Sequence, residues 1–254
     1  MAQRYFIELS YRGTNYHGWQ IQPNGNSIQS ELEKALSTLL KEDISTTGAG
    51  RTDAGVHASF YVAHFDSEHD RINQKSKFIY HLNSVLPTDI SVRDIVPVKA
   101  EAHARFSALS RSYNYVISRN KDPFSLGLAW QFYGPLNVDL MRLAADSLLL
   151  HSDFTSFSKV GSDNKTSICK VYTANWEEKD GKLIFNIRAD RFLRNMVRAI
   201  VGTLVDVGRN KISPDEFVRI IDAKDRSLAG ASAPAEGLYL NGVEYPVDLY
   251  LNKR

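Results

Sequence analysis

The stretch GAGRTDAGVHA, residues 48–58, sets one aspartate, Asp53, two residues after Arg51 among three glycines, with neither a helical nor a strand period. Glycines let a ligand approach the backbone closely, so a phosphate cradle is the first chemistry to consider. A dinucleotide fingerprint needs glycine at the position of Asp53, and a P-loop needs lysine and then serine or threonine where Val56 and His57 stand. Residue identity therefore excludes both phosphate-binding motifs.

Metal and acyl-transfer chemistry are also poorly supported by the sequence. The seven histidines include no HExxH pair, and the single cysteine, Cys169, cannot supply the Cys pairs of a structural zinc site. Asp53 has no acidic neighbour with which to share a cation, and the chain contains no GxSxG elbow. We therefore expect no metal at this stretch.

Two interpretations of Asp53 remain open from the residues alone. In the structural one, the glycines shape a turn, and Asp53 caps backbone amides while it pairs with Arg51. In the functional one, Asp53 is a lone catalytic carboxylate. Glycosidases that use water need two carboxyl groups, whereas a reaction that breaks a glycosidic bond and reconnects the same fragments needs no water. One carboxylate can suffice for such a reaction.

Composition limits the class of protein but not its partner. The chain has 254 residues, of which 43% are hydrophobic and 24% charged, typical of a soluble globular protein of one large domain or two ordinary ones. A net charge of +2 neither requires nor excludes nucleic acid. No apolar run approaches the roughly 20 residues of a membrane span. We expect a cytoplasmic protein with no membrane association, in which Cys169 is a buried strand residue.

Periodicity predicts alternating strands and helices in the first part of the chain. Ser27 is expected to open a helix, because apolar residues follow it at helical spacing, and Pro87 is expected to end a second helix. The predicted order is strand 4–13, helix from Ser27, strand 57–66, helix 74–86 and strand 90–98.

The second part repeats this alternation. A hairpin is predicted around residues 179–181, and Ser213, Pro214 and Glu216 have the spacing of a capping box at a helix start. The other predicted elements are strand 111–119, helix 138–150, hairpin strands 168–178 and 182–189, and a long helix from about Arg191 to Val207. We expect two α/β halves, residues 1–105 and 106–254.

Seven motifs, in order across nearly the whole chain, give it a close resemblance to the tRNA pseudouridine synthase A family. The nine-residue motif around Asp53 is the most specific of them. The motifs are YHGWQ (16–20), GRTDAGVHA (50–58), HARFSA (103–108), RSYNY (111–115), DFTSF (153–157), MVRAIVG (196–202) and AEGLYL (235–240).

The resemblance implies an isomerase that converts uridine to pseudouridine at nucleotides 38, 39 and 40 of the anticodon stem-loop of tRNA, without metal or cofactor. It also implies the pseudouridine synthase fold, in which two similar mixed or antiparallel sheets are flanked by helices and the active-site cleft lies between the halves. The first half would carry the catalytic aspartate and the second would complete the site. The resemblance further implies a homodimer that binds tRNA.

The resemblance assigns a role to five residues. Asp53 matches the catalytic aspartate, Tyr113 the active-site tyrosine, and Arg51 the arginine that displaces the target base. Arg198 matches the arginine that pairs with the catalytic acid, and Leu238 a leucine of the base pocket.

These roles agree with the chemistry that isomerisation requires. The carboxylate of Asp53 must attack the sugar, attack the base or remove a ribose proton, and these alternatives stay open. Apolar residues such as Val56 and Leu238 would exclude water that competes for the sugar. A stem uridine must also leave the helix, and the guanidinium of Arg51 can stack while it binds phosphate.

Basic and aromatic residues elsewhere are candidates for RNA contacts. Arg191, Arg194 and Arg198 have i, i+3, i+7 spacing on the predicted long helix, although such a stripe is often only a solvated face. Arg105 and Arg111 alternate with aromatic residues, a pattern that suits phosphate contacts and base stacking or an ordinary core strand. The loop residues Tyr16, Trp19 and Gln20 are predicted either to contact RNA or to pack.

Two alternative functions stay open on the sequence. The chain could be a pseudouridine synthase with another RNA target, because a motif speaks for chemistry more strongly than for substrate. It could also be a non-catalytic RNA-binding or tRNA-folding protein. The intact set of Arg51, Asp53, Tyr113, Arg198 and Leu238 argues against the second alternative, since a binding protein needs no desolvated acid.

Overall fold

The computed structural model describes residues 2–23, 25–69, 72, 75–161 and 165–251. Contacts between residues divide the chain into two units, of which unit 1 comprises residues 1–109 and 240–254 and unit 2 comprises residues 110–239. Each unit contains antiparallel strands and helices, so the predicted α/β class is confirmed.

Unit 1 is built on three long antiparallel strands, β1 (Gln3–Tyr11), β3 (His57–Ser67) and β4 (Ile90–Pro97), with β1 between the other two. The middle of β1, from Tyr5 to Leu9, is buried without interruption, as expected of a strand covered on both faces. The two-residue strand β2 (Thr47–Gly48), which periodicity did not predict, pairs with β3.

Two helices complete the first part of unit 1. α1 (Ile28–Leu40) begins after Ser27, whose hydroxyl accepts from the backbone N–H of Ser30 in a capping box, as the predicted helix start requires. The apolar side chains at helical spacing along α1 are buried. α2 (Lys75–Val85) packs against β4, and it ends two residues before Pro87, which confirms the predicted helix.

The C-terminal residues belong to unit 1, which differs from the predicted halves of 1–105 and 106–254. The chain returns through β9 (Leu238–Glu244), and main-chain bonds hold the residues after it. Leu109 N donates to Glu244 O at 2.8 Å, and Lys99 N donates to Leu249 O at 2.9 Å. Sequence patterns do not report such long-range bonds, so the predicted division differs from the units at residues 106–109 and 240–254.

Unit 2 contains the strands β5 (Ser110–Ser118), β8 (Lys182–Ala189) and β7 (Val171–Lys179), which pair antiparallel in that order. A short strand, β6 (Trp130–Gln131), pairs parallel with β5. The predicted hairpin is confirmed, because Asp180 and Gly181 connect β7 to β8 with φ of 50° and 72°. Positive φ at both central residues is the signature of a type I′ turn.

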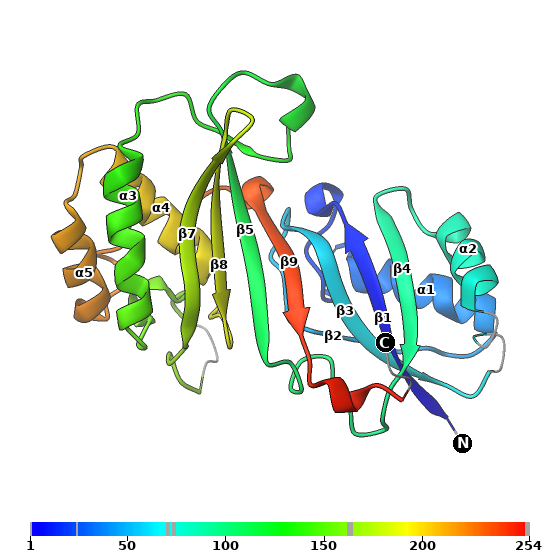
Figure 1. Cartoon of the computed structure of the whole chain (residues 1–254). Coiled ribbons are helices and arrows are strands. Elements are labelled where there is room, and N and C mark those ends of the chain that lie inside the picture. The colour runs from blue at the N-terminus through cyan, green and yellow to red at the C-terminus, as the bar shows by residue number, and fades with distance from the viewer. Residues whose placement is uncertain (1, 24, 70–71, 73–74, 162–164, 252–254) are drawn as a thin grey trace. The chain divides into compact units, whose positions relative to one another are not determined.

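Three helices lie together on one side of the strands of unit 2 (Figure 1): α3 (Val138–Asp146), α4 (Met196–Gly208) and α5 (Pro214–Ala223). α4 is buried on nearly every side and forms the centre of this unit. The predicted capping box at Ser213 and Glu216 is confirmed at the start of α5. Short 3-10 turns complete the described elements: Gly13–Asn15, Pro123–Ser125, Ser147–Leu150, Thr155–Phe157, Ala235–Gly237 and Val247–Leu249.

The predicted helix from Arg191 was wrong at its start, because α4 begins only at Met196. Asn195 has a left-handed backbone with φ of 66°, which an α-helix does not tolerate. Ahead of it, Arg191 N donates to the carboxylate of Asp190 and Lys159 N donates to Arg194 O, so the segment is bound as a loop. Arg191 and Arg194 therefore share no helical face with α4.

No helix within the described ranges has both the length and the apolar character needed to cross a lipid bilayer.

Candidate active site

Asp53 lies on a turn between β2 and β3 of unit 1. Val56 N donates to Asp53 O at 3.2 Å, and Gly55, inside this turn, has a φ of 78°. The side chain of Asp53 is half-buried, that of Arg51 is exposed and that of Val56 is buried. The three residues that the sequence predicted on this stretch therefore share one loop, in which Asp53 stands between Arg51 and Val56 along the chain.

A second loop, residues 13–19, supports the loop of Asp53 through the backbone. Trp19 N donates to Thr52 O at 3.4 Å, and Gly55 N donates to Tyr16 O at 3.3 Å. The two loops approach so closely at Gly18 that a Cβ there would lie 2.2 Å from Thr52 O. The YHGWQ motif is thus the structural support of the aspartate loop.

Tyr16 and Trp19 are buried, which agrees with the packing alternative that the sequence left open for them. The hydroxyl of Tyr16 donates to Asp89 at 2.5 Å, and burial, together with this carboxylate, raises the pKa of Tyr16 well above its usual value. The ring of Trp19 stacks on Tyr61 with centroids 4.2 Å apart. Gln20, by contrast, is exposed, and its contact with RNA stays a prediction.

Tyr113 belongs to unit 2, where it is half-buried on β5. The edge of its ring meets Phe192, with centroids 5.1 Å apart and planes at 88°. Phe192 lies in the loop before α4, in the segment that periodicity had assigned to the helix. Because that segment is a loop, its aromatic residue can support the predicted active-site tyrosine.

Arg198 and Leu238 also belong to unit 2. Arg198 is hydrogen-bonded to Ala233, which precedes Leu238 by five residues in the sequence. The Nε of Arg198 donates to Ala233 O at 2.7 Å, and Ala233 N donates back to Arg198 O at 2.9 Å. The hydroxyl of Tyr115 donates to Pro234 O at 2.8 Å, and Leu238, four residues later, is buried. Burial raises the pKa of Tyr115, and the charge of Arg198 opposes that rise.

The predicted site residues thus fall into two groups. Arg51, Asp53 and Val56 share one loop of unit 1, and Tyr113, Arg198 and Leu238 lie on β5, α4 and β9, at positions that belong to unit 2. The pairing of Arg198 with the carboxylate stays a prediction.

The predicted RNA contacts differ in exposure. Arg105 is exposed, with its guanidinium 5.5 Å from the centroid of the exposed Phe106 ring. Arg111 is half-buried and donates to Asp190 O at 3.1 Å, while Arg191 is half-buried and Arg194 is exposed. The pair of Arg105 and Phe106 presents a cation and an aromatic face together.

Two histidines that the sequence analysis did not single out hold the loop of Arg105. The Nδ1 of His64 accepts from Ala104 N at 3.1 Å, and the Nδ1 of His103 accepts from Arg105 N at 3.1 Å and from Phe106 N at 3.2 Å. An Nδ1 that accepts is unprotonated, so both rings act here as neutral imidazoles. Only the position of His64, at an inward site on β3, could have indicated this role.

The neutral state of His64 predicts a pH-dependent stability. Burial chiefly lowers the pKa of His64 to about 4, aided by Arg4 and His103 and opposed by Asp66. The unfolded chain, with an ordinary histidine pKa of about 6.5, takes up a proton first as the pH falls. The free energy of unfolding should therefore decrease from about pH 6.5 towards pH 4, and this group should have no effect above that window.

Urea denaturation between pH 4 and pH 7.5 checks this expectation against His64→Asn. The Oδ1 of asparagine can accept from Ala104 N but does not titrate. The free energy of unfolding of the variant should depend less on pH than that of the wild type below about pH 6.5. Parallel curves would show that His64 does not carry the effect.

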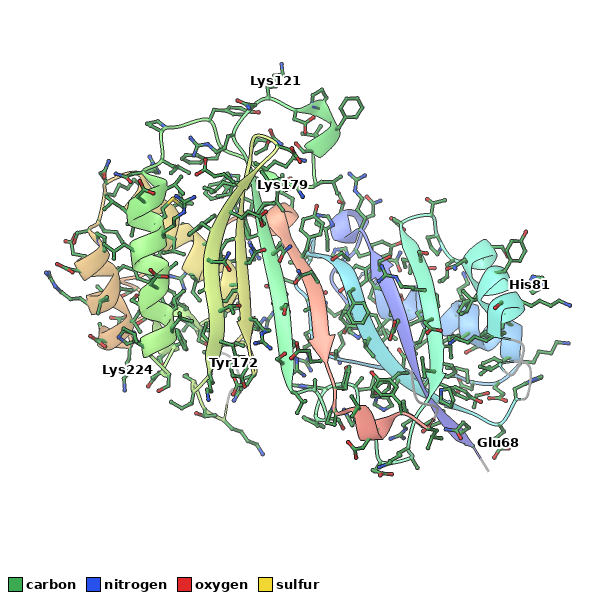
Figure 2. All side chains as sticks on the ribbon, in the orientation of Figure 1. Glu68, His81, Lys121, Tyr172, Lys179 and Lys224 are labelled. Carbon is green, nitrogen blue, oxygen red and sulfur yellow. The ribbon has the colours of Figure 1, made fainter. Side chains whose placement is uncertain are left out.

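A basic and aromatic cluster in unit 2 was also missed by the sequence analysis. Tyr172, labelled in Figure 2, lies near the start of β7. The Nζ of Lys170 lies 5.7 Å and the Cζ of Arg188 5.0 Å from the centroid of its ring. Arg188 is opposite Ser112 in the register of β5 and β8. Ser112 stands between Arg111 and Tyr113 in the sequence, so Arg188 joins the cluster to the strand positions of these two residues.

Cys169 is buried, as expected, although it lies two residues before β7 rather than within a strand. Burial raises the pKa of its thiol to about 12, so the thiolate needed for nucleophilic chemistry is strongly disfavoured. Within the described part of the chain, no group of three or more His, Cys, Asp or Glu side chains is arranged to hold a metal ion.

Comparison with known proteins places the chain in a family. A family model described as tRNA pseudouridine synthase matches residues 9–107 and 144–246. Proteins named tRNA pseudouridine synthase A are similar to this chain over nearly their whole length. The one from Bacteroides thetaiotaomicron is 53% identical over 253 residues, which cover 98% of this chain and 93% of the relative.

More distant relatives have the same name. The protein from Porphyromonas gingivalis is 50% identical over 250 residues, with 98% of this chain and 99% of the relative covered. The protein from Exiguobacterium sibiricum is 38% identical over 244 residues, with 96% of this chain and 97% of the relative covered.

Proposed function

Since the chain belongs to the tRNA pseudouridine synthase family, we propose that it isomerises uridine to pseudouridine at nucleotides 38, 39 and 40 of the anticodon stem-loop of tRNA, with Asp53 as the catalytic carboxylate. Family membership supports the isomerisation of uridine in tRNA. The position in tRNA and the roles of single residues are the proposal.

The observation that supports Asp53 most strongly is the way its loop is held. The loop is bound by the backbone of residues 13–19 and continues directly into β3, yet the carboxylate itself is only half-buried. A structural cap would need only a turn. A catalytic carboxylate needs a fixed backbone and an accessible side chain, because catalysis depends on a near-attack geometry.

The chemistry follows from the atoms that change partners. The bond between the ribose and the base nitrogen breaks, and the uracil rotates while it stays bound. A uracil carbon then bonds to the ribose and loses its proton, and the freed nitrogen takes up a proton. Asp53 starts this sequence by attack on the sugar, by attack on the base or by removal of a ribose proton. No water enters the products, so the site must exclude it.

Other residues would assist Asp53. Arg51 is exposed, as a side chain must be that displaces a base from the RNA helix and holds the opened state. Val56 and Leu238 are buried apolar residues that suit the walls of a base pocket. Tyr113 can stack on the base through its ring and hydrogen-bond through its hydroxyl, and Arg198 would orient the carboxylate of Asp53.

We further propose that the protein acts in the cytoplasm as a homodimer that holds tRNA across both subunits. The family resemblance supports the dimer, and the single buried cysteine suits a reducing compartment. Sedimentation of the protein alone and with tRNA measures both stoichiometries.

Tritium release tests the proposed activity. Unmodified tRNA carries tritium on the uracil carbon that becomes bonded to ribose, so each isomerisation releases one label to water. We expect tritium release to stop once the label at nucleotides 38, 39 and 40 has been consumed. Release from other positions would indicate a synthase with another RNA target, and tight tRNA binding without release would indicate a non-catalytic RNA-binding protein.

The basic residues predict a steep salt dependence of tRNA binding. Each phosphate contact releases counterions, so the logarithm of the association constant should fall linearly with the logarithm of salt concentration. Arg191→Ala and Arg194→Ala should each reduce the slope by about 1, because each removes one phosphate contact. Filter binding at several salt concentrations measures the slopes.

Arg142→Ala is the matched control for these variants. Arg142 lies on α3, where its guanidinium binds Asp139 and Glu178 on the surface, so its loss should leave the slope unchanged. A slope that is shallow in the wild type, or equal in all variants, would contradict the proposed phosphate contacts of Arg191 and Arg194.

A further inference from the structure

Three aromatic side chains form a buried cluster beside the loop of Asp53. Trp19 stacks on Tyr61 with centroids 4.2 Å apart and planes at 27°, and Tyr11 lies 5.6 Å from Tyr61 and 6.4 Å from Trp19. Their exposed fractions are 3%, 0% and 4% for Trp19, Tyr61 and Tyr11. The cluster joins β1, β3 and the loop of residues 13–19, all within unit 1.

The two tyrosine hydroxyls of this cluster bind the chain on either side of Arg51. The hydroxyl of Tyr61 donates to Gly50 O at 2.5 Å, and the hydroxyl of Tyr11 is 2.9 Å from the Oγ1 of Thr52, a buried contact in which either oxygen can donate. Gly50 directly precedes Arg51, and Thr52 directly precedes Asp53.

The fit between the cluster and the loop is close. A Cβ at Gly48 would lie 2.0 Å from the hydroxyl oxygen of Tyr61 and 2.5 Å from the Nε1 of Trp19. The chain must therefore have glycine there for the rings to reach the segment after it. Phenylalanine would supply the same ring at either tyrosine position, so burial of apolar area alone does not explain the hydroxyls.

We propose that Tyr61 and Tyr11 are positioning residues, whose hydroxyls hold the chain on both sides of Arg51, at the carbonyl of Gly50 and at the side chain of Thr52, and thereby set the directions of Arg51 and Asp53. This inference rests on the proposed function of Asp53. Rigid side chains are suited to the task, because a stacked and buried ring cannot follow the loop if it moves. An error of about 1 Å in the position of a reacting group can lower a rate about 100-fold.

Tyr61→Phe tests the proposal, because it keeps the stacked ring and removes the bond to Gly50 O. At saturating enzyme, the single-turnover rate of tritium release should fall about 10- to 100-fold, whereas the dissociation constant for tRNA should stay within about 3-fold of wild type. Tyr245→Phe is the matched control. It removes a tyrosine bond of 2.6 Å to another backbone carbonyl of unit 1, that of Ala104.

The second hydrogen bond allows a double-mutant cycle. Tyr11→Phe and Thr52→Val each remove the same contact with little change of shape, so each should lower the single-turnover rate, and the double variant should be no slower than the slower single one. Independent losses that multiply would show that the two groups do not act through one bond.

The outcomes separate this inference from the proposed function. A wild-type protein that releases no tritium overturns the proposed function, and the inference with it. An active wild type with an unchanged rate in Tyr61→Phe overturns the inference alone, as does an equal loss of rate in Tyr245→Phe. A fall in rate in Tyr61→Phe with a normal melting temperature and normal tRNA affinity supports it.

Discussion

Asp53→Asn is expected to abolish tritium release from tRNA, with a loss of rate of more than about 10³-fold, while the affinity for tRNA stays within a few-fold of wild type. Asparagine has nearly the shape of aspartate, so the turn that contains residue 53 should be kept. Its neutral amide can neither attack the ribose or base nor accept a ribose proton at a useful rate. The effect should therefore fall on chemistry and leave binding and folding nearly unchanged.

The measurements are single-turnover tritium release, tRNA binding and thermal unfolding of the same preparations. Asp43→Asn is the matched control, because it removes one carboxylate from an exposed position of unit 1, in the loop after α1. That variant should keep full activity. Loss of tRNA binding or of folding in Asp53→Asn, or activity within 10-fold of wild type, would contradict the catalytic role of Asp53.

Gly18→Ala is expected to lower the free energy of unfolding by about 2 to 4 kcal/mol and to reduce the rate of isomerisation at the same time. Gly18 has a φ of 90°, which an L side chain rarely adopts, and a Cβ there would lie 2.2 Å from Thr52 O. The oxygen belongs to the backbone just before Asp53 and cannot rotate away. Either residues 13–19 or the loop of Asp53 must move.

Urea denaturation and single-turnover rates measure the two effects, and Gly50→Ala is the matched control for stability. Gly50 lies in the same loop as Asp53, but no neighbouring atom lies within 4 Å of a Cβ there, and its φ is not positive. The free energy of unfolding of Gly50→Ala should therefore stay within about 1 kcal/mol of wild type. Equal losses in both variants would show that contact with Thr52 O is not the cause.

Local sequence signals predicted the elements that depend on neighbouring residues. The capping residues Ser27 and Ser213 mark the starts of α1 and α5, because a hydroxyl satisfies amides only two or three positions away. The turn of Asp180 and Gly181 likewise depends on the backbone freedom of those residues themselves. Such signals need no information from the rest of the chain.

The same local rules failed where a distant contact decided the backbone. Helical spacing of Arg191 and Arg194 suggested that α4 starts early, but the bond of Lys159 N to Arg194 O and the left-handed Asn195 hold this segment as a loop. The C-terminal residues joined unit 1 through main-chain bonds to residues more than a hundred positions away. Periodicity contains no record of such bonds.

For the site, the sequence by itself determined which residues have the chemical groups that the proposed reaction needs. Asp53 and Arg51 stand in one short motif, so a single loop carries both the carboxylate and the cation. What only the tertiary structure decided is how that loop is held. Tyr11 and Tyr61 lie on different strands, and their hydroxyls meet the loop only because β1 and β3 pair side by side, with a register shift between Leu9, opposite Tyr61, and Tyr11. Chemical identity is a property of single residues, whereas position is a property of the packed chain.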